Sequence, residues 1–237
     1  MLEMAQQLEF AAGIRRDVPR NILVEVQEVF PVGARQADHS VNSSESKEER
    51  PLVLSSRRKR LAIGLLRAQM LDEAFEQILT RNGVEFVRQI KIDVGTDEKK
   101  DTPVFLTVGR FGSTLLGFAS HLKIEDLPNK RSKSRRALCT LNRGLTRDLF
   151  GHPESYRDAD RFAVLMVRRD LEDVSKIATI TVCLIDARQE RFVYQQELGE
   201  FLAGYGSTSG VPARRTTLLK SVKTTFKGSP TGEQGTK

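Results

Sequence analysis

The order of the predicted elements places this chain in the α+β class, as a mostly antiparallel sheet packed on two main helices with a disordered basic C-terminal tail. Strand-like segments follow one another in runs instead of alternating singly with helices. Two other segments, 55–82 and 132–150, repeat apolar residues at three- and four-residue steps. Beyond residue 205, Gly, Ser, Thr and Pro dominate and the apolar period is lost.

Composition divides the 237 residues into four parts. A polar, Ser-rich stretch without an apolar period separates the first elements from the rest of the chain. We therefore expect an N-terminal helix and strand (1–32), a flexible polar loop or linker (33–54), an α+β globular core (55–205) and a disordered basic tail (206–237).

The N-terminal part is predicted to hold a short helix over residues 2–12 and a strand over 21–30. In the strand, Ile22, Val24 and Val26 occupy every second position, which is typical of a half-buried β-strand.

A long helix is expected from Ser55 or Ser56, either of which can cap it, to Asn82, where Gly83 ends it. Its apolar stripe is broad enough for contacts on more than one side, so we expect it to be the central helix. The main stripe comprises Leu61, Leu65, Ala68, Leu71, Phe75 and Leu79.

The remaining strands are predicted from alternating apolar residues bounded by turn residues. Three of them form a meander on the long helix, and three more follow a second helix over residues 132–150. The six predicted strands cover 84–94, 103–108, 113–124, 161–168, 177–185 and 191–198.

Positive charge is concentrated in a few segments of a chain whose net charge is +7. Residues 130–147 contain seven Lys or Arg and no Asp or Glu. On a helical projection, Leu138, Leu141, Leu145 and Leu149 share one side of the second helix. The opposite side carries Lys133, Arg136, Arg143 and Arg147, and the first turn of the long helix adds Arg57, Arg58, Lys59 and Arg60.

A basic ridge of this kind suits a polyanion, because the planar guanidinium of Arg donates several hydrogen bonds to phosphate oxygens. We expect a non-enzymatic protein that binds DNA or RNA mainly through phosphates. The alternative is a protein-interaction module that docks an acidic partner. Aromatic residues make up only 6% of the chain and Trp is absent, which counts against binding of single strands by base stacking.

No catalytic motif is found in the sequence. The Gly109 to Gly112 segment lacks the spacing of a phosphate-binding loop and fits a hairpin turn. An enzyme with a dispersed site would have to use His121, Glu73, Asp93 and Asp101. Two isolated cysteines and three unpaired histidines predict neither a disulfide nor a metal site. We expect no cofactor and no small-molecule ligand.

The order of a long helix followed by a hairpin resembles that of restriction-endonuclease-like nucleases, over about 70 residues. Glu73 or Glu76 would stand for the helix carboxylate of that family. The metal-binding Asp is replaced by Val104, and no second carboxylate occurs near Gly117. The resemblance therefore implies a catalytically degenerate nuclease-like fold that still binds nucleic acid.

Apolar runs long enough to cross a membrane are absent from the sequence, since no stretch of about 18 consecutive apolar residues occurs. The N-terminal residues include Glu3 and two glutamines where a secretory signal has a basic start and an apolar run. The expected location is the cytoplasm, without contact to a membrane.

Overall fold

The computed structural model describes residues 2–45, 54–93, 99–121, 127, 132–145 and 160–206. Residues Met1–Gly206 form one compact unit. The predicted α+β class with a mostly antiparallel sheet is confirmed. The predicted disorder of the basic tail concerns residues 207–237, which lie outside the described residues.

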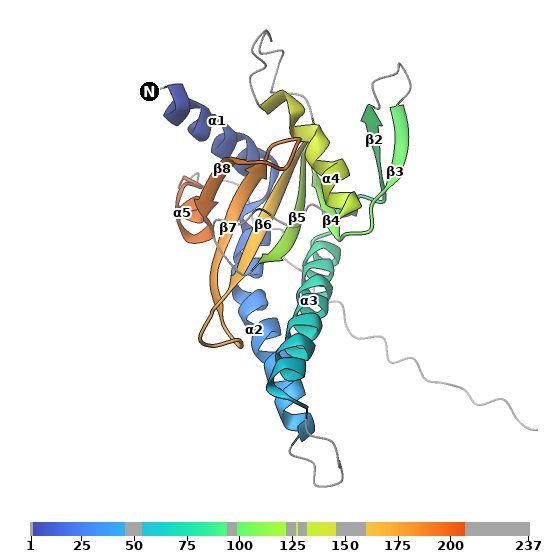
Figure 1. Ribbon diagram of the computed structural model, residues 1–237. Coiled ribbons are helices and arrows are strands. Elements are labelled where there is room, and N and C mark those ends of the chain that lie inside the picture. The colour runs from blue at the N-terminus through green and yellow to red at the C-terminus, as the bar shows by residue number, and fades with distance from the viewer. Residues whose placement is uncertain are drawn as a thin grey trace, which may run out of the picture. The chain divides into compact units, whose positions relative to one another are not determined.

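Five α-helices and one 3₁₀ helix belong to the described part of the chain (Figure 1). Helices α2 and α3 lie side by side and antiparallel: near the start of α2 Asn21 and Glu25 bond Asn82 after α3, and farther along Phe30 packs on Phe75. The helices are α1 (Leu2–Asp17), α2 (Arg20–Glu45), α3 (Ser56–Arg81), α4 (Lys133–Cys139), the 3₁₀ helix η1 (Thr140–Leu145) and α5 (Leu198–Ala203).

The main sheet has six strands in the order β1-β4-β5-β6-β7-β8. All neighbours are antiparallel except β5 and β6, which run parallel and are separated in the chain by α4. A separate two-stranded sheet pairs β2 with β3. The strands are β1 (Glu85–Phe86), β2 (Gln89–Asp93), β3 (Lys99–Pro103), β4 (Val108–Phe111), β5 (Thr114–His121), β6 (Arg161–Arg169), β7 (Ile177–Ile185) and β8 (Phe192–Glu197).

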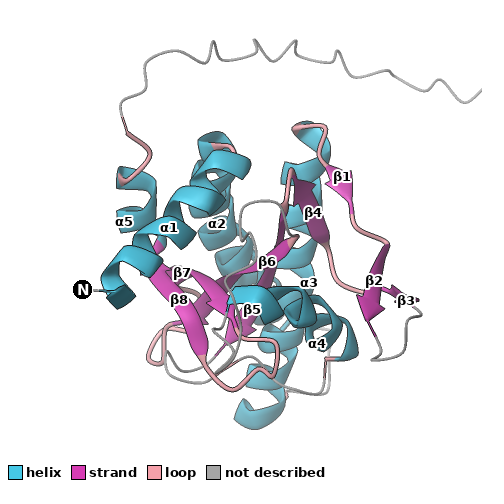
Figure 2. Ribbon diagram, turned by 90° about the horizontal axis from the view of Figure 1, so that it is seen from above, coloured by secondary structure: helices cyan, strands magenta, loops and turns pink. Residues whose placement is uncertain are grey.

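Both faces of the main sheet are covered. Strand β6 is buried over most of its length, and alternate residues point to opposite faces. Ala163, Leu165 and Val167 pack in a core cluster with α1, α2, α3 and α5. Phe162 and Val164 pack in a second cluster with α4 and the β2–β3 hairpin. Figure 2 shows α1, α2 and α5 on one side of the sheet and α4 on the other.

The predicted strand over 21–30 is wrong, because these residues form the first part of α2. Ile22, Val26 and Phe30 satisfy a two-residue period and a four-residue period alike, so alternation could not distinguish strand from helix. Burial of Leu23 beside Ile22 shows the helical spacing. Packing against α3 overrides the local preference of the β-branched residues for a strand.

The predicted loop or linker over 33–54 is also wrong in its first part, since α2 continues to Glu45. Ala34, Ala37 and Val41 recur at three- and four-residue steps and are buried. Polar residues (Ser, Asp and Arg) separate these small side chains. The average composition of the stretch is therefore polar, although one side of the helix is apolar. Residues 46–53 lie outside the described residues.

Helix α3 begins and ends as predicted, but its buried stripe differs in the first half. The Ser55 side chain accepts a hydrogen bond from the Arg58 amide at 3.4 Å, and Gly83 takes a positive φ of 65° after the helix. Leu61 and Leu65, expected in the core, are each 66% exposed. Arg67 is buried instead, because its guanidinium donates to the carbonyls of Val174 and Lys176 at 2.9 and 3.0 Å.

The segment 84–94 is not one strand, since β1 and β2 belong to different sheets. The predicted strand over 103–108 is also wrong: β3 ends at Pro103 and β4 begins at Val108. Val87, between β1 and β2, is buried and donates its amide to the Val108 carbonyl at 2.9 Å. The strands predicted over 161–168, 177–185 and 191–198 match β6, β7 and β8 within one or two residues.

Candidate nucleic-acid interface

Two serines fix the start of the basic segment 132–145. Ser132 caps α4 by accepting a hydrogen bond from the Arg135 amide at 3.3 Å. Ser134 is buried, and its hydroxyl accepts from the amide of Phe105 at 3.0 Å. The first turn of α4 is therefore fixed to the loop between β3 and β4.

Asn142 fixes the other end of the segment. Its side chain is fully buried and bonds two strands at once: the amide nitrogen donates to the carbonyls of Phe162 and Ile185 at 2.9 and 2.8 Å, and the amide oxygen accepts from the Phe162 nitrogen at 2.8 Å. These bonds hold η1 close to the ends of β6 and β7. The predicted single helix over 132–150 is wrong at this point, because the chain tightens into a 3₁₀ turn after Cys139.

The inner side of the segment contains the expected leucines. Leu138 and Leu145 are buried and Leu141 is half-buried, while Leu149 lies outside the described residues. Arg135 is half-buried on this side, where burial lowers the pKa of its guanidinium. Burial raises the pKa of the Cys139 thiol to about 11.

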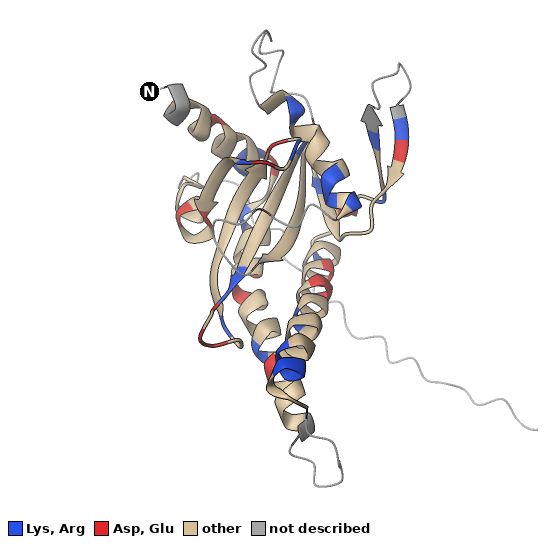
Figure 3. Cartoon of the chain, viewed as in Figure 1, with Lys and Arg blue, Asp and Glu red and all other residues tan. Residues whose placement is uncertain are grey.

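The outer side presents Lys133, Arg136 and Arg143, all of which are exposed. We call these three residues the α4 basic patch. The segment 132–145 contains no Asp or Glu, and Figure 3 shows the Lys and Arg side of α4. Arg147, which was predicted to extend the patch, lies outside the described residues.

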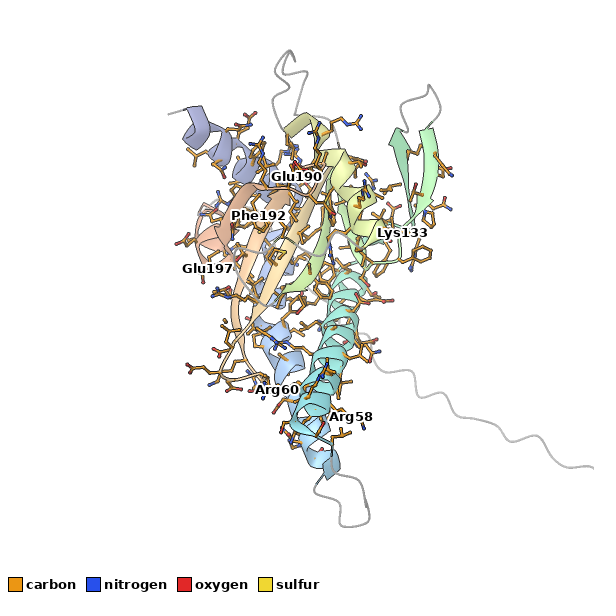
Figure 4. All side chains as sticks on the ribbon, in the orientation of Figure 1. Arg58, Arg60, Lys133, Glu190, Phe192 and Glu197 are labelled. Carbon is orange, nitrogen blue, oxygen red and sulfur yellow. The ribbon has the colours of Figure 1, made fainter. Side chains whose placement is uncertain are left out.

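The second predicted group of cations lies elsewhere. Arg57, Arg58 and Arg60 are exposed and Lys59 is half-buried in the first turn of α3. Figure 4 shows Arg58 and Arg60 near the lower end of α3, far from Lys133 on α4. Acidic residues lie farther along α3, towards its C-terminal end (Figure 3). The structure therefore does not join these two groups into one surface.

A buried polar cluster that the sequence did not predict joins α1 to β5 and β6. The Asp17 carboxylate accepts hydrogen bonds from the hydroxyls of Ser113 and Thr114, each at 2.7 Å. The buried Arg161 donates to the Ser113 hydroxyl at 3.2 Å, and its guanidinium leaves no room for a side chain at Gly13. Burial alone would raise the pKa of Asp17, but bonds from Ser113, Thr114 and Arg16 together hold this pKa below its usual value.

A cavity of about 290 Å³ adjoins this cluster. Its lining mixes one acidic and two basic side chains with apolar groups, and Arg161 is already bonded to Ser113. The lining residues are Glu9, Phe10, Ala12, Gly13, Arg16, Leu145 and Arg161.

The candidates for a dispersed catalytic site are not assembled in the part of the chain that the structure describes. Glu73 is exposed on α3 and accepts a hydrogen bond from Gln77, while Asp101 is exposed in β3. The side chains of Asp93 and His121 lie outside that part. Among the described residues, no three His, Cys, Asp or Glu side chains are grouped so that they could hold a metal ion.

None of the helices within the described ranges has the length and apolar character needed to cross a membrane. Comparisons with protein-family models, with curated proteins and with solved structures found no match to this chain.

Proposed function

We propose that this protein is a non-enzymatic, cytoplasmic protein that binds nucleic acid through phosphate contacts from the α4 basic patch. The observation that carries the proposal is the two-sided character of the segment 132–145. Its apolar side packs into the core, while Lys133, Arg136 and Arg143 are exposed without an acid in the same segment. A face that serves only solubility usually mixes both signs of charge.

The chemistry of the patch suits phosphate. Arginine offers a planar fork of donors that matches phosphate oxygens, and lysine adds a compact positive charge. Because Ser134 and Asn142 fix both ends of the segment, the cations start from a rigid backbone. Less conformational entropy is then lost when they bind. Two buried free cysteines, Cys139 and Cys183, agree with a reducing compartment.

The test is a salt titration of binding to fluorescently labelled DNA and RNA. The wild-type protein should bind with an affinity that falls steeply as salt rises, since each neutralised phosphate releases counterions. Changing Lys133 and Arg136 together to Gln should reduce the magnitude of the log–log salt slope by about 1.4–1.8. Fold stability should hardly change, because both side chains are exposed.

The matched control is the double change of Arg57 and Arg58 to Gln, which removes the same charge from the start of α3. It should leave most of the slope intact, because these residues lie far from the α4 basic patch (Figure 4). If the wild-type protein binds neither DNA nor RNA at low salt, the proposal is wrong and an acidic protein partner becomes the better explanation. An equal loss in both double variants would contradict a site located at the α4 basic patch.

A further inference from the structure

One large aromatic side chain is left in water beside the α4 basic patch. Phe105 is 82% exposed, and among the described aromatic residues it is the only one that is largely exposed. The sequence places it beside Val104, which is buried, so its exposure is visible only in the structure.

The backbone under the Phe105 ring is fixed on both sides. The Phe105 amide donates to the Ser134 hydroxyl of α4 at 3.0 Å, and the preceding amide of Val104 donates to the Arg88 carbonyl at 2.9 Å. Ser134 is buried and Val104 packs in the second core cluster. The ring is therefore carried by a rigid loop between two anchored elements.

Two exposed cations lie next to or among the residues that anchor this loop. Lys133 is exposed and immediately precedes Ser134, to which the Phe105 amide is bonded. Arg88, whose carbonyl accepts from the Val104 amide, is also exposed, and its guanidinium lies 5.2 Å from the Phe86 ring centre. In the adjoining hairpin, Asp101 is paired in register with Lys91 and Asp93 with Lys99.

An exposed ring among cations suits a single strand of nucleic acid. The π-face of a base stacks on an aromatic ring, while the phosphates of the same strand form ion pairs with neighbouring Lys or Arg side chains. The bases of a duplex are stacked on one another and do not offer this face without being flipped out. The positive charge and the exposed ring thus both favour single-stranded nucleic acid as the ligand.

We propose that the protein binds single-stranded nucleic acid, with a base stacked on Phe105 and the adjacent phosphates bound by Lys133 and Arg136. This inference rests on the proposed function and specifies its substrate class. The low aromatic content of the chain counts against binding of single strands by stacking, but one ring in the right place is enough for one base.

The experiment compares Phe105→Ala with the wild-type protein on two labelled probes, oligothymidylate and an abasic strand with the same number of phosphates. Loss of one stacked base should weaken binding to oligothymidylate about 5- to 150-fold. Binding to the abasic strand should not change, and the salt slope should be the same for both proteins. Phe105→Tyr, which keeps the ring, should bind oligothymidylate as the wild type does.

Leu171→Ala is the matched control, because Leu171 is 74% exposed and follows the end of β6, so it belongs to neither α4 nor the Phe105 loop. Its affinity for oligothymidylate should equal that of the wild type. Thermal unfolding of Phe105→Ala should also be unchanged, since the ring is mostly in water and the Ser134 hydrogen bond uses only the backbone.

Two results overturn the stacking proposal while leaving the phosphate-binding function in place. One is salt-dependent binding of the wild-type protein that Phe105→Ala retains in full. The other is equal binding of oligothymidylate and the abasic strand by the wild-type protein. Absence of any wild-type binding at low salt would overturn the proposed function itself.

Discussion

At the scale of single residues, buried polar side chains hold this fold together at points where the chain changes direction. Asp17 joins the end of α1 to the start of β5, Asn142 joins η1 to β6 and β7, and Arg67 joins α3 to the β6–β7 turn. Each of these side chains forms hydrogen bonds with buried backbone or hydroxyl groups, which would otherwise lack a partner. Loss of such a partner costs more than the bond itself contributes, because it leaves buried groups unpaired.

We predict that Asp17→Asn lowers the free energy of unfolding by about 1.5–3 kcal/mol near neutral pH, the range for hydrogen bonds to a charged group. The pKa of Asp17 is held below its usual value in the folded protein, so folding favours the carboxylate. This contribution is complete above the pKa of an unfolded Asp, about 4, and is lost as pH falls through the lower folded pKa.

The difference between wild type and Asp17→Asn should therefore shrink as the pH falls below about 4. Urea denaturation at a series of pH values measures it. Asp72→Asn, at an exposed position on α3, should change the stability by less than about 0.5 kcal/mol at every pH. A difference that stays constant down to pH 2 would show that the Asp17 charge contributes nothing.

At the scale of elements, the segment formed by α4 and η1 combines a structural and a surface role. Leu138 packs in the core cluster on one face of the sheet and Leu145 in the cluster on the other. The backbone of Leu145 also accepts a hydrogen bond from Gln6 of α1 at 3.3 Å. The segment thus contacts both core clusters, while Lys133, Arg136 and Arg143 stay exposed and Arg135 is half-buried.

We predict that Leu145→Ala destabilises the protein by about 2–5 kcal/mol, because its side chain is buried in the main core cluster. Leu61→Ala is the control on α3, where the leucine is 66% exposed, and it should cost less than about 0.5 kcal/mol. Denaturant melts of both variants provide the comparison. Equal, small losses would mean that the apolar side of the basic segment does not dock.

At the scale of the whole molecule, the compact unit is closed by contacts between its first and last elements. Arg15 of α1 donates to the Phe201 carbonyl at 3.1 Å and stacks over the Phe201 ring at 4.5 Å. The Tyr205 hydroxyl donates to the Val18 carbonyl at 2.8 Å. All described residues of both core clusters lie within Met1–Gly206.

We predict that removal of residues 207–237 changes the melting temperature by no more than about 2 °C, since the truncated chain keeps every core residue that the structure describes. Differential scanning calorimetry of the shortened and full-length chains measures this. Loss of cooperative unfolding on truncation would show that part of the segment, such as Leu218 or Leu219, docks on the unit.

The sequence by itself determined the features that depend on local periodicity and local chemistry. The alternation in 161–168, 177–185 and 191–198 predicted three strands, and Ser55 and Gly83 marked the limits of α3. The leucine spacing from Leu138 onwards predicted which side of the basic segment would be buried. These patterns predict correctly because a helix or strand must bury one apolar side, whichever element it packs against.

Only the tertiary structure decided the features that depend on partners distant in the chain. The segment 21–30 forms a helix that packs along α3. Arg67 is buried because its guanidinium donates hydrogen bonds to the carbonyls of a turn more than 100 residues away. Exposure of Phe105 beside Lys133 depends on a hydrogen bond from its backbone to Ser134, 29 residues later. The local spacing of apolar residues does not predict such contacts, because their free energy depends on where the rest of the chain lies.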